Sequence, residues 1–135
     1  MRALAVLVCS FLFLAPLARA EDAPDVKAII SGQLDAFTRD DAKAAYEFAA
    51  PEIRDKFPDA ETFLTMVKSG YPPVYRHRSV QFGDEARDGD NIRQNVVFVD
   101  PDNRVWRGVY LLVREADGAW KIQGCALLPS DETSL

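Results

Sequence analysis

The hydrophobic pattern of the chain changes its period once, at the segment from Gly70 to Arg78, and this change limits the folds that the chain can adopt. Before the segment, apolar residues recur at helical spacing. After it, runs rich in β-branched and aromatic residues are separated by turn-forming residues, which is typical of strands. The segment holds Pro72, Pro73 and the only histidine, His77, so we interpret it as the connector between two halves. Helices followed by strands predict an α+β domain, with N-terminal helices packed on a curved antiparallel meander of about four strands.

Each helix of the first half has a recognisable start or end. Pro24 suits a first helical turn, and Asp40 is a good N-cap for a second helix. Pro51 restarts the chain as a short third helix, and Asp59 caps a fourth. Gly70 is expected to end the fourth helix by adopting the left-handed conformation that glycine tolerates.

The second half predicts strands at residues 79–83, 92–99, 104–114 and 119–128. Residues 129–135 are expected to form a loose polar tail. If the two later turns pair Val99 with Arg104 and Arg114 with Ala119, alternation along the strands places one apolar face on the helices. That face would consist of Ile92, Val96, Phe98, Val105, Val109, Leu111, Val113, Trp120, Ile122, Ala126 and Leu128.

Two polar residues, Gln94 and Arg107, fall on this otherwise apolar face as diagonal neighbours. A buried amide or guanidinium requires a partner, and arginine can hold a carboxylate through two parallel hydrogen bonds. The pair therefore marks a candidate pocket for a small anionic or carboxylate-bearing ligand, and a purely structural pair is the equal alternative. Tyr71, Tyr75 and His77 of the connector complete the candidate pocket, although anchoring of the connector is the favoured role of the two tyrosines.

The opposite face of the sheet is expected to be mixed, with apolar side chains at Val97, Trp106, Tyr110 and Leu112. This is more apolar area than a monomer usually exposes. We therefore expect this outer face to form a symmetric homodimer or a heteromeric contact.

The first twenty residues have the pattern of a secretory signal peptide. Arg2 precedes an apolar run from Ala3 to Leu14, and Ala18-Arg19-Ala20 is a small-residue cleavage site. The run is shorter than the roughly 18 apolar residues that a membrane-spanning helix needs. We expect cleavage after Ala20, a periplasmic or secreted location, and a single domain over residues 21–128.

The chain is acidic, with a formal net charge of −5 that would become −7 when Arg2 and Arg19 leave with the signal. An acidic domain without a basic tail argues against nucleic acid and anionic membrane surfaces as partners. Cleavage would leave Cys125 as the one cysteine, so the fold must be stable without an internal disulfide. One histidine and one cysteine cannot build a zinc centre, and no metal or other cofactor is expected.

The sequence offers little for acid–base catalysis. The predicted strands hold no acidic residue in their interiors, and the acids of the second half lie mostly in turns. His77 could carry a proton near neutral pH, but its neighbours Arg76 and Arg78 favour an exposed position in a loop. No catalytic residue is therefore assigned.

Four segments resemble a bacterial domain of unknown function, family 4864, whose members look like small exported proteins. They are residues 30–41 (ISGQLDAFTRDD), 44–54 (AAYEFAAPEIR), 63–76 (FLTMVKSGYPPVYR) and 120–125 (WKIQGC). The order of elements is also similar to the cystatin-like, or nuclear transport factor 2-like, cone. That resemblance implies a fold shared by isomerases, dehydratases, cyclases and non-catalytic binding or dimerisation modules, and the fold does not choose among them.

The favoured hypothesis is a small exported module that binds a ligand or a protein without a catalytic centre. The alternative is a small cone-fold enzyme of isomerase, dehydratase or hydrolase type with a cavity lined by Tyr, Arg and His. A third hypothesis is a purely structural envelope protein. A cavity that brings Tyr71, Tyr75, His77 and Arg107 together would favour the enzyme, and a cavity filled by Phe and Leu side chains would oppose it.

Overall fold

The computed structural model of the protein describes residues 24–133, with side chains as far as Asp131. The predicted signal segment and its cleavage site lie outside the described residues. Five helices are followed by four strands, which confirms the α+β class and the expected order of elements. The helices are α1 (Val26–Thr38), α2 (Ala42–Glu47), α3 (Pro51–Lys56), α4 (Ala60–Gly70) and α5 (Pro72–Tyr75). The strands are β1 (Ser79–Asp88), β2 (Asn91–Val99), β3 (Arg104–Arg114) and β4 (Trp120–Thr133).

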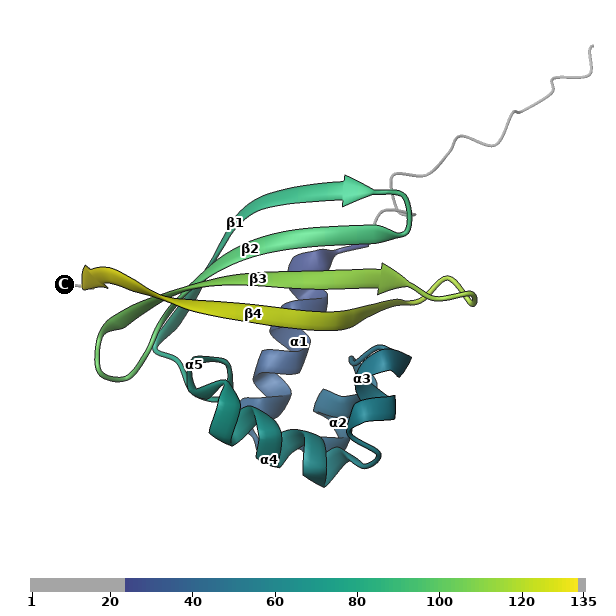
Figure 1. Ribbon diagram of the computed structural model, residues 1–135, viewed down its shortest axis with the longest axis horizontal. Helices are drawn as coiled ribbons and strands as arrows, with labels where there is room; N and C mark the ends of the chain where they lie inside the picture. The colour runs from purple at the N-terminus through teal and green to yellow at the C-terminus, as the bar shows by residue number, and fades with distance from the viewer. Residues whose placement is uncertain (1–23, 134–135) are drawn as a thin grey trace, which may run out of the picture.

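The strands form one sheet in the order β1-β2-β3-β4, and each is antiparallel to the next, as a meander requires. All five helices lie on one side of the curved sheet, and α1 crosses the direction of the strands (Figure 1). Burial of apolar surface between these two layers is the main stabilising contribution. It involves Ile30, Leu34 and Phe37 of α1 and Phe98 and Leu112 of the sheet. Within residues 24–133, no helix is long and apolar enough to cross a membrane.

Aspartate side chains begin three of the helices. Asp25, Asp41 and Asp59 each accept a hydrogen bond from the backbone N–H three residues further on, at 3.1, 3.1 and 2.7 Å. Each bond satisfies an N–H group that the first helical turn leaves without a partner. The expected cap at Asp59 is confirmed. The expected cap at Asp40 is wrong by one residue, because Asp40 itself has a φ of 53° and Asp41 is the N-cap of α2.

The connector differs from expectation at its start. Gly70 is the last residue of α4 rather than a left-handed cap, and Tyr71 follows it as the C-cap. Tyr71 is also the N-cap of the one-turn helix α5, which begins with Pro72 and Pro73. Proline suits these first helical positions, since their N–H groups have no partner in the helix. The two prolines therefore begin a short helix within the connector.

The predicted orientation of β3 is wrong, because the turn before this strand holds one residue more than expected. Val99 pairs with Val105 instead of Arg104. A shift of one residue moves every side chain of a strand to the opposite face. Tyr110 and Leu112, which were expected on the outer face, are therefore buried against the helices, with 1% and 0% of their surfaces exposed. The side chains that face outward in their place are those of Arg107, Val109, Leu111 and Val113.

The carboxylate of Asp100 sets the length of this turn. It accepts hydrogen bonds from the backbone N–H groups of Asp102 and Arg104, both at 2.9 Å. It also accepts one from the indole Nε1 of Trp106 at 3.0 Å. Trp106, another residue expected on the outer face, pairs with Phe98 and packs half-buried against the core. Asn103, in the same turn, takes the left-handed conformation, with a φ of 64°.

The last strand changes faces part of the way along its length. The turn before it also holds one residue more than expected, so Arg114 pairs with Trp120. Trp120 and Ile122 consequently face inward as predicted. The register then shifts at Gln123, which is the effect of a β-bulge. Beyond the bulge, the inward side chains are Cys125 and Leu127, and the outward ones are Ala126 and Leu128.

Strand β4 also contacts the junction between α2 and α3. The backbone N–H of Ala50 donates to the carbonyl oxygen of Ile122, and the N–H of Ile122 donates to that of Phe48, both at 2.8 Å. These bonds attach the helical layer to the sheet through the main chain. The strand continues to Thr133, so residues 129–133 are strand rather than the expected loose tail.

Gln94 faces the helices as expected, and the main chain satisfies its buried amide. Its Nε2 donates to the carbonyl oxygens of Gly83 and Asn95 at 2.9 and 2.8 Å. The register of β1 against β2 shifts at this point, between Phe82 and Glu85. Gln94 therefore stabilises an irregularity of β1, which supports the structural alternative for this residue.

We expect Gln94→Leu to lower the free energy of unfolding by about 1–3 kcal/mol, because it removes the buried amide that donates to the main-chain carbonyl groups of Gly83 and Asn95. Urea denaturation followed by circular dichroism would measure the change. Gln81→Leu is the matched control, since Gln81 is exposed on the neighbouring strand and its loss should stay within about 0.5 kcal/mol. A Gln94→Leu protein as stable as the wild type would contradict this role.

Candidate functional site

A cavity of about 260 Å³ lies between the helices and the inner face of β3 and β4. Most of its wall is hydrocarbon. Phe63 of α4 is central to that wall, since its ring lies 5.9 Å from the ring of Phe37 and 6.2 Å from that of Phe57, measured between centroids. The apolar lining includes Phe37, Phe57, Phe63, Val67, Val74 and Ile122.

Six polar or ionisable side chains interrupt this lining: Gln33, Lys56, Tyr71, Tyr110, Gln123 and Cys125. Two of them already have partners. Gln33 is buried and its Nε2 donates to the carbonyl oxygen of Ala45 at 3.2 Å. The Nε2 of Gln123 donates to the carboxylate of Glu52 on α3.

Tyr110 differs from these residues because its hydroxyl has no hydrogen-bond partner among the residues that the structure describes. The side chain projects from the middle of β3 and is 1% exposed. Cys125 lies opposite it on β4 and is close enough to act on its pKa, but the two groups do not meet hydrogen-bond geometry. Burial raises the pKa of Tyr110 well above its usual value. The hydroxyl therefore stays protonated and can both donate and accept a hydrogen bond.

The thiol of Cys125 lines the same cavity. Burial raises the pKa of this thiol to about 12. The Tyr110 hydroxyl acts in the opposite direction, but its effect on the pKa is smaller. Because the nucleophile in cysteine chemistry is the thiolate, the protonated thiol is a poor nucleophile at neutral pH. Cys125 therefore acts as a small apolar residue of the cavity wall.

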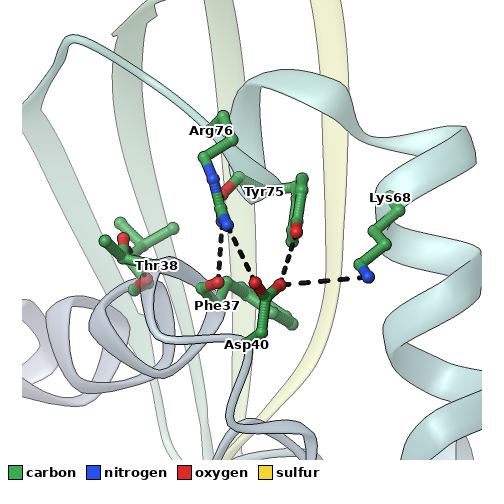
Figure 2. Close-up of polar contacts among 7 residues, drawn as sticks. Phe37, Thr38, Asp40, Lys68, Tyr75 and Arg76 are labelled. Carbon is green, nitrogen blue, oxygen red and sulfur yellow. Dashed lines mark hydrogen bonds and ion pairs between the residues drawn. The ribbon is translucent and has the colours of Figure 1, made fainter.

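The connector tyrosines have different surroundings. Tyr71 lines the cavity, as expected of a pocket residue. Tyr75 does not: its hydroxyl donates to the carboxylate of Asp40, in the turn between α1 and α2 (Figure 2). Tyr75 therefore anchors the connector, which was its favoured role, although it does so to the helices rather than to the sheet as expected.

Asp40 is the centre of a polar cluster around this anchor (Figure 2). Its carboxylate pairs with Arg76 at 3.2 Å and with Lys68 at 3.9 Å. Arg76 also donates to the carbonyl oxygen of Phe37 at 2.8 Å, and its guanidinium lies 3.9 Å from the centroid of the Tyr75 ring. The Tyr75 hydroxyl and the two cations hold the pKa of Asp40 below its usual value. The cluster joins α1, α4 and α5, and its charged residues Asp40, Lys68 and Arg76 do not line the cavity.

The other predicted site residues do not meet at the cavity. His77 is half-buried rather than exposed, and its ring packs on Phe98 with 5.5 Å between centroids. Burial lowers its pKa. Arg107 is exposed on the outer face, so it and Gln94 lie on opposite sides of the sheet. The predicted pairing of Arg107 with Gln94 is therefore wrong, for the same reason that β3 is inverted.

Tyr110, Lys56 and Gln33 line the cavity but were not predicted as site residues from the sequence. Gln33 carried a usable signal, since it is a polar residue on the apolar face of the first helix. No feature of the sequence placed Tyr110 in the cavity, because the inward orientation of its side chain depends on the length of the turn at Asp100. Within residues 24–133, no group of three His, Cys, Asp or Glu side chains is arranged to hold a metal ion.

We expect Cys125 to react slowly with iodoacetamide at pH 8 in the folded protein and quickly in urea. The pKa of about 12 leaves almost no thiolate at that pH, whereas unfolding restores an ordinary thiol. Mass spectrometry of the peptide that contains Cys125 would follow the reaction. Equal rates in the two states would contradict the buried, protonated thiol.

Comparison with known proteins identifies the family and supports the fold. The family model for a domain of unknown function, DUF4864, matches residues 19–135, which confirms the resemblance seen in the sequence. A search of curated proteins gives no match. The solution structure of a SEC-C motif containing protein from Rhodopseudomonas palustris is similar, with a TM-score of 0.56 and 15% identity over 80% of each chain. At that identity the similarity concerns the fold alone. Because the family model covers most of its length, the chain belongs to the DUF4864 family.

Proposed function

We propose that the protein binds a small, mainly apolar molecule in the cavity between its helices and its sheet. The observation that carries this proposal is the Tyr110 hydroxyl, which is buried in the cavity wall without a partner among the described residues. An unpaired buried hydroxyl destabilises a protein by about 1–3 kcal/mol. A ligand atom that forms a hydrogen bond with the Tyr110 hydroxyl would remove this destabilisation. The same hydrogen bond would orient the ligand in the cavity.

The size and chemistry of the cavity suit a compact ligand. If each water-sized group takes about 30 Å³, a volume of about 260 Å³ accommodates about nine such groups. A mainly apolar wall with a few fixed polar groups is typical of small-molecule sites. The phenylalanine side chains would contact the hydrocarbon part of the ligand, and Tyr110 would take its polar group.

The lining favours binding over acid–base catalysis. Among the described residues that line the cavity, none is an aspartate, a glutamate or a histidine. Tyr110, which is buried, and Cys125, which is half-buried, have raised pKa values and stay protonated at neutral pH. Of the residues that the enzyme hypothesis required, Tyr75, His77 and Arg107 lie outside the lining. Neither a proton acceptor nor a nucleophile is therefore available at this site near neutral pH.

The signal segment predicted at residues 1–20 supports a location in the periplasm or outside the cell. We propose that the ligand is taken up there, after cleavage at Ala20. A buried thiol with a high pKa suits an oxidising compartment, since it resists oxidation without needing a disulfide partner.

Self-association through the outer face of the sheet is a second candidate function. Leu111 and Leu128 are the large hydrophobic residues exposed in the described chain, at 44% and 69%. They face outward from adjacent strands, and the paired residues Val109 and Ala126 lie between them. The resulting apolar stripe replaces the predicted interface, of which Tyr110 and Leu112 are in the core. A second copy of the chain that places the same stripe against it would bury both.

We expect Tyr110→Phe to raise the free energy of unfolding of the ligand-free protein by about 1 kcal/mol while it reduces ligand retention. The stability should rise because an unpaired buried hydroxyl is removed. Native mass spectrometry of protein purified from its own cell envelope would detect a retained small molecule, and urea denaturation would measure stability.

Tyr46→Phe provides the matched control for this substitution. The Tyr46 hydroxyl donates to the carbonyl oxygen of Phe57 at 2.6 Å, so its loss should destabilise the protein by about 0.5–1.5 kcal/mol. If Tyr110→Phe destabilises the protein as Tyr46→Phe does, the Tyr110 hydroxyl has a structural partner. The proposal would then lose the observation on which it depends.

We expect Leu128→Glu to weaken self-association without unfolding the protein, because it places a charge in the proposed contact. Analytical ultracentrifugation over a range of concentrations would measure the association. Thr65→Glu is the control, since Thr65 is exposed on α4, in the helical layer. A wild-type protein that remains monomeric at the highest concentration would exclude this second function.

A further inference from the structure

Lys56 is the one charged residue among the described residues that line the cavity. It is exposed at the last position of α3, whereas Tyr110 is fully buried on the opposite, sheet side. The cavity therefore has a cation at its mouth and an uncharged hydroxyl at its base. The positive charge at the cavity mouth is opposite in sign to the formal net charge of the chain, which is −5.

The Lys56 ammonium has no ion pair within the part of the chain that the structure describes. The nearest acid along the same face of α3 is Glu52, one turn earlier, and it receives the amide of Gln123 instead. Gln123 also lines the cavity, so this contact engages the Glu52 carboxylate beside the mouth. Lys56 therefore remains available to an anion that enters.

We propose that the ligand is a small organic acid whose carboxylate meets Lys56 and whose far end carries a hydroxyl or carbonyl group that meets Tyr110. This inference rests on the proposed function, because it names the ligand class of the same cavity. Between the two polar contacts, the phenylalanine-lined wall requires a hydrocarbon body, such as one aromatic ring. The class is therefore that of compact hydroxy or keto acids with an apolar middle.

The strength of the Lys56 contact is limited by solvent. Exposed ion pairs are screened by water and salt, so a single lysine at a cavity mouth changes affinity only a few-fold. A lysine at a helix C-terminus also interacts favourably with the helix dipole, whatever the ligand. The useful comparison is therefore between two ligands of the same shape that differ only in charge.

The experiment uses 4-hydroxyphenylacetate and its neutral amide, 4-hydroxyphenylacetamide, as probes. Titrations followed by two-dimensional NMR of the backbone amides report both the affinity and the residues affected. We expect shifts at cavity residues, and an affinity about two- to fivefold higher for the acid than for the amide at low salt. Lys56→Gln and high salt should each bring this ratio close to one, mainly by lowering the affinity of the acid.

Lys43→Gln is the charge-matched control, since Lys43 is exposed on α2 and does not line the cavity. It should leave the acid-to-amide ratio unchanged. Equal binding of acid and amide to the wild type, with both weakened by Tyr110→Phe, would overturn the anion inference and leave the binding cavity intact. If neither probe shifts a cavity residue, both the inference and the proposed function fail.

Discussion

The arrangement of the sheet depends on the hydrogen bonds of the Asp100 carboxylate. By accepting two backbone N–H groups and the Trp106 indole, it closes a turn of five residues between the paired Val99 and Val105. The turn fixes the register of β3, and the register decides which side chains face the helices. Tyr110 reaches the cavity for this reason. With a turn of four residues, the same strand would direct Arg107 inward and Tyr110 outward.

The parts of the fold that follow from local signals could be predicted from the sequence. The change of period at Gly70 separated helices from strands, Asp59 identified a helix start, and alternation gave the inward residues of β2. The candidate site could not be predicted in the same way. Its sheet residues depend on the lengths of two turns and on the bulge at Gln123, and in each case a single residue decides which face the side chains take. Hydrogen bonds from side chains to the main chain decide how many residues a turn or a bulge holds. The alternation of apolar and polar residues along a strand does not reveal these numbers.

The connector joins the two layers, and only one of its tyrosines faces the cavity. Tyr75 and Arg76 attach α5 to the turn between α1 and α2 through Asp40, while Tyr71, four residues earlier, lines the cavity. Exposed ion pairs such as that of Arg76 contribute little individually. Two further contacts orient the Arg76 side chain. It donates a hydrogen bond to the main chain of Phe37, and its guanidinium stacks on the ring of Tyr75. The position of Tyr71 in the cavity wall is thereby coupled to a cluster outside it.

A sheet of four strands has two edges, and the open N–H and C=O groups of an edge are where chains add to one another during aggregation. On β4, the main-chain groups of Ile122 are already bonded to Phe48 and Ala50, so an incoming strand meets no continuous row there. On β1, the irregularity between Phe82 and Glu85 interrupts the row in the middle of the strand. The two edges are therefore both poorly suited to strand addition. The proposed contact between copies of the protein, through the outer face of the sheet, would depend on side chains rather than on main-chain pairing.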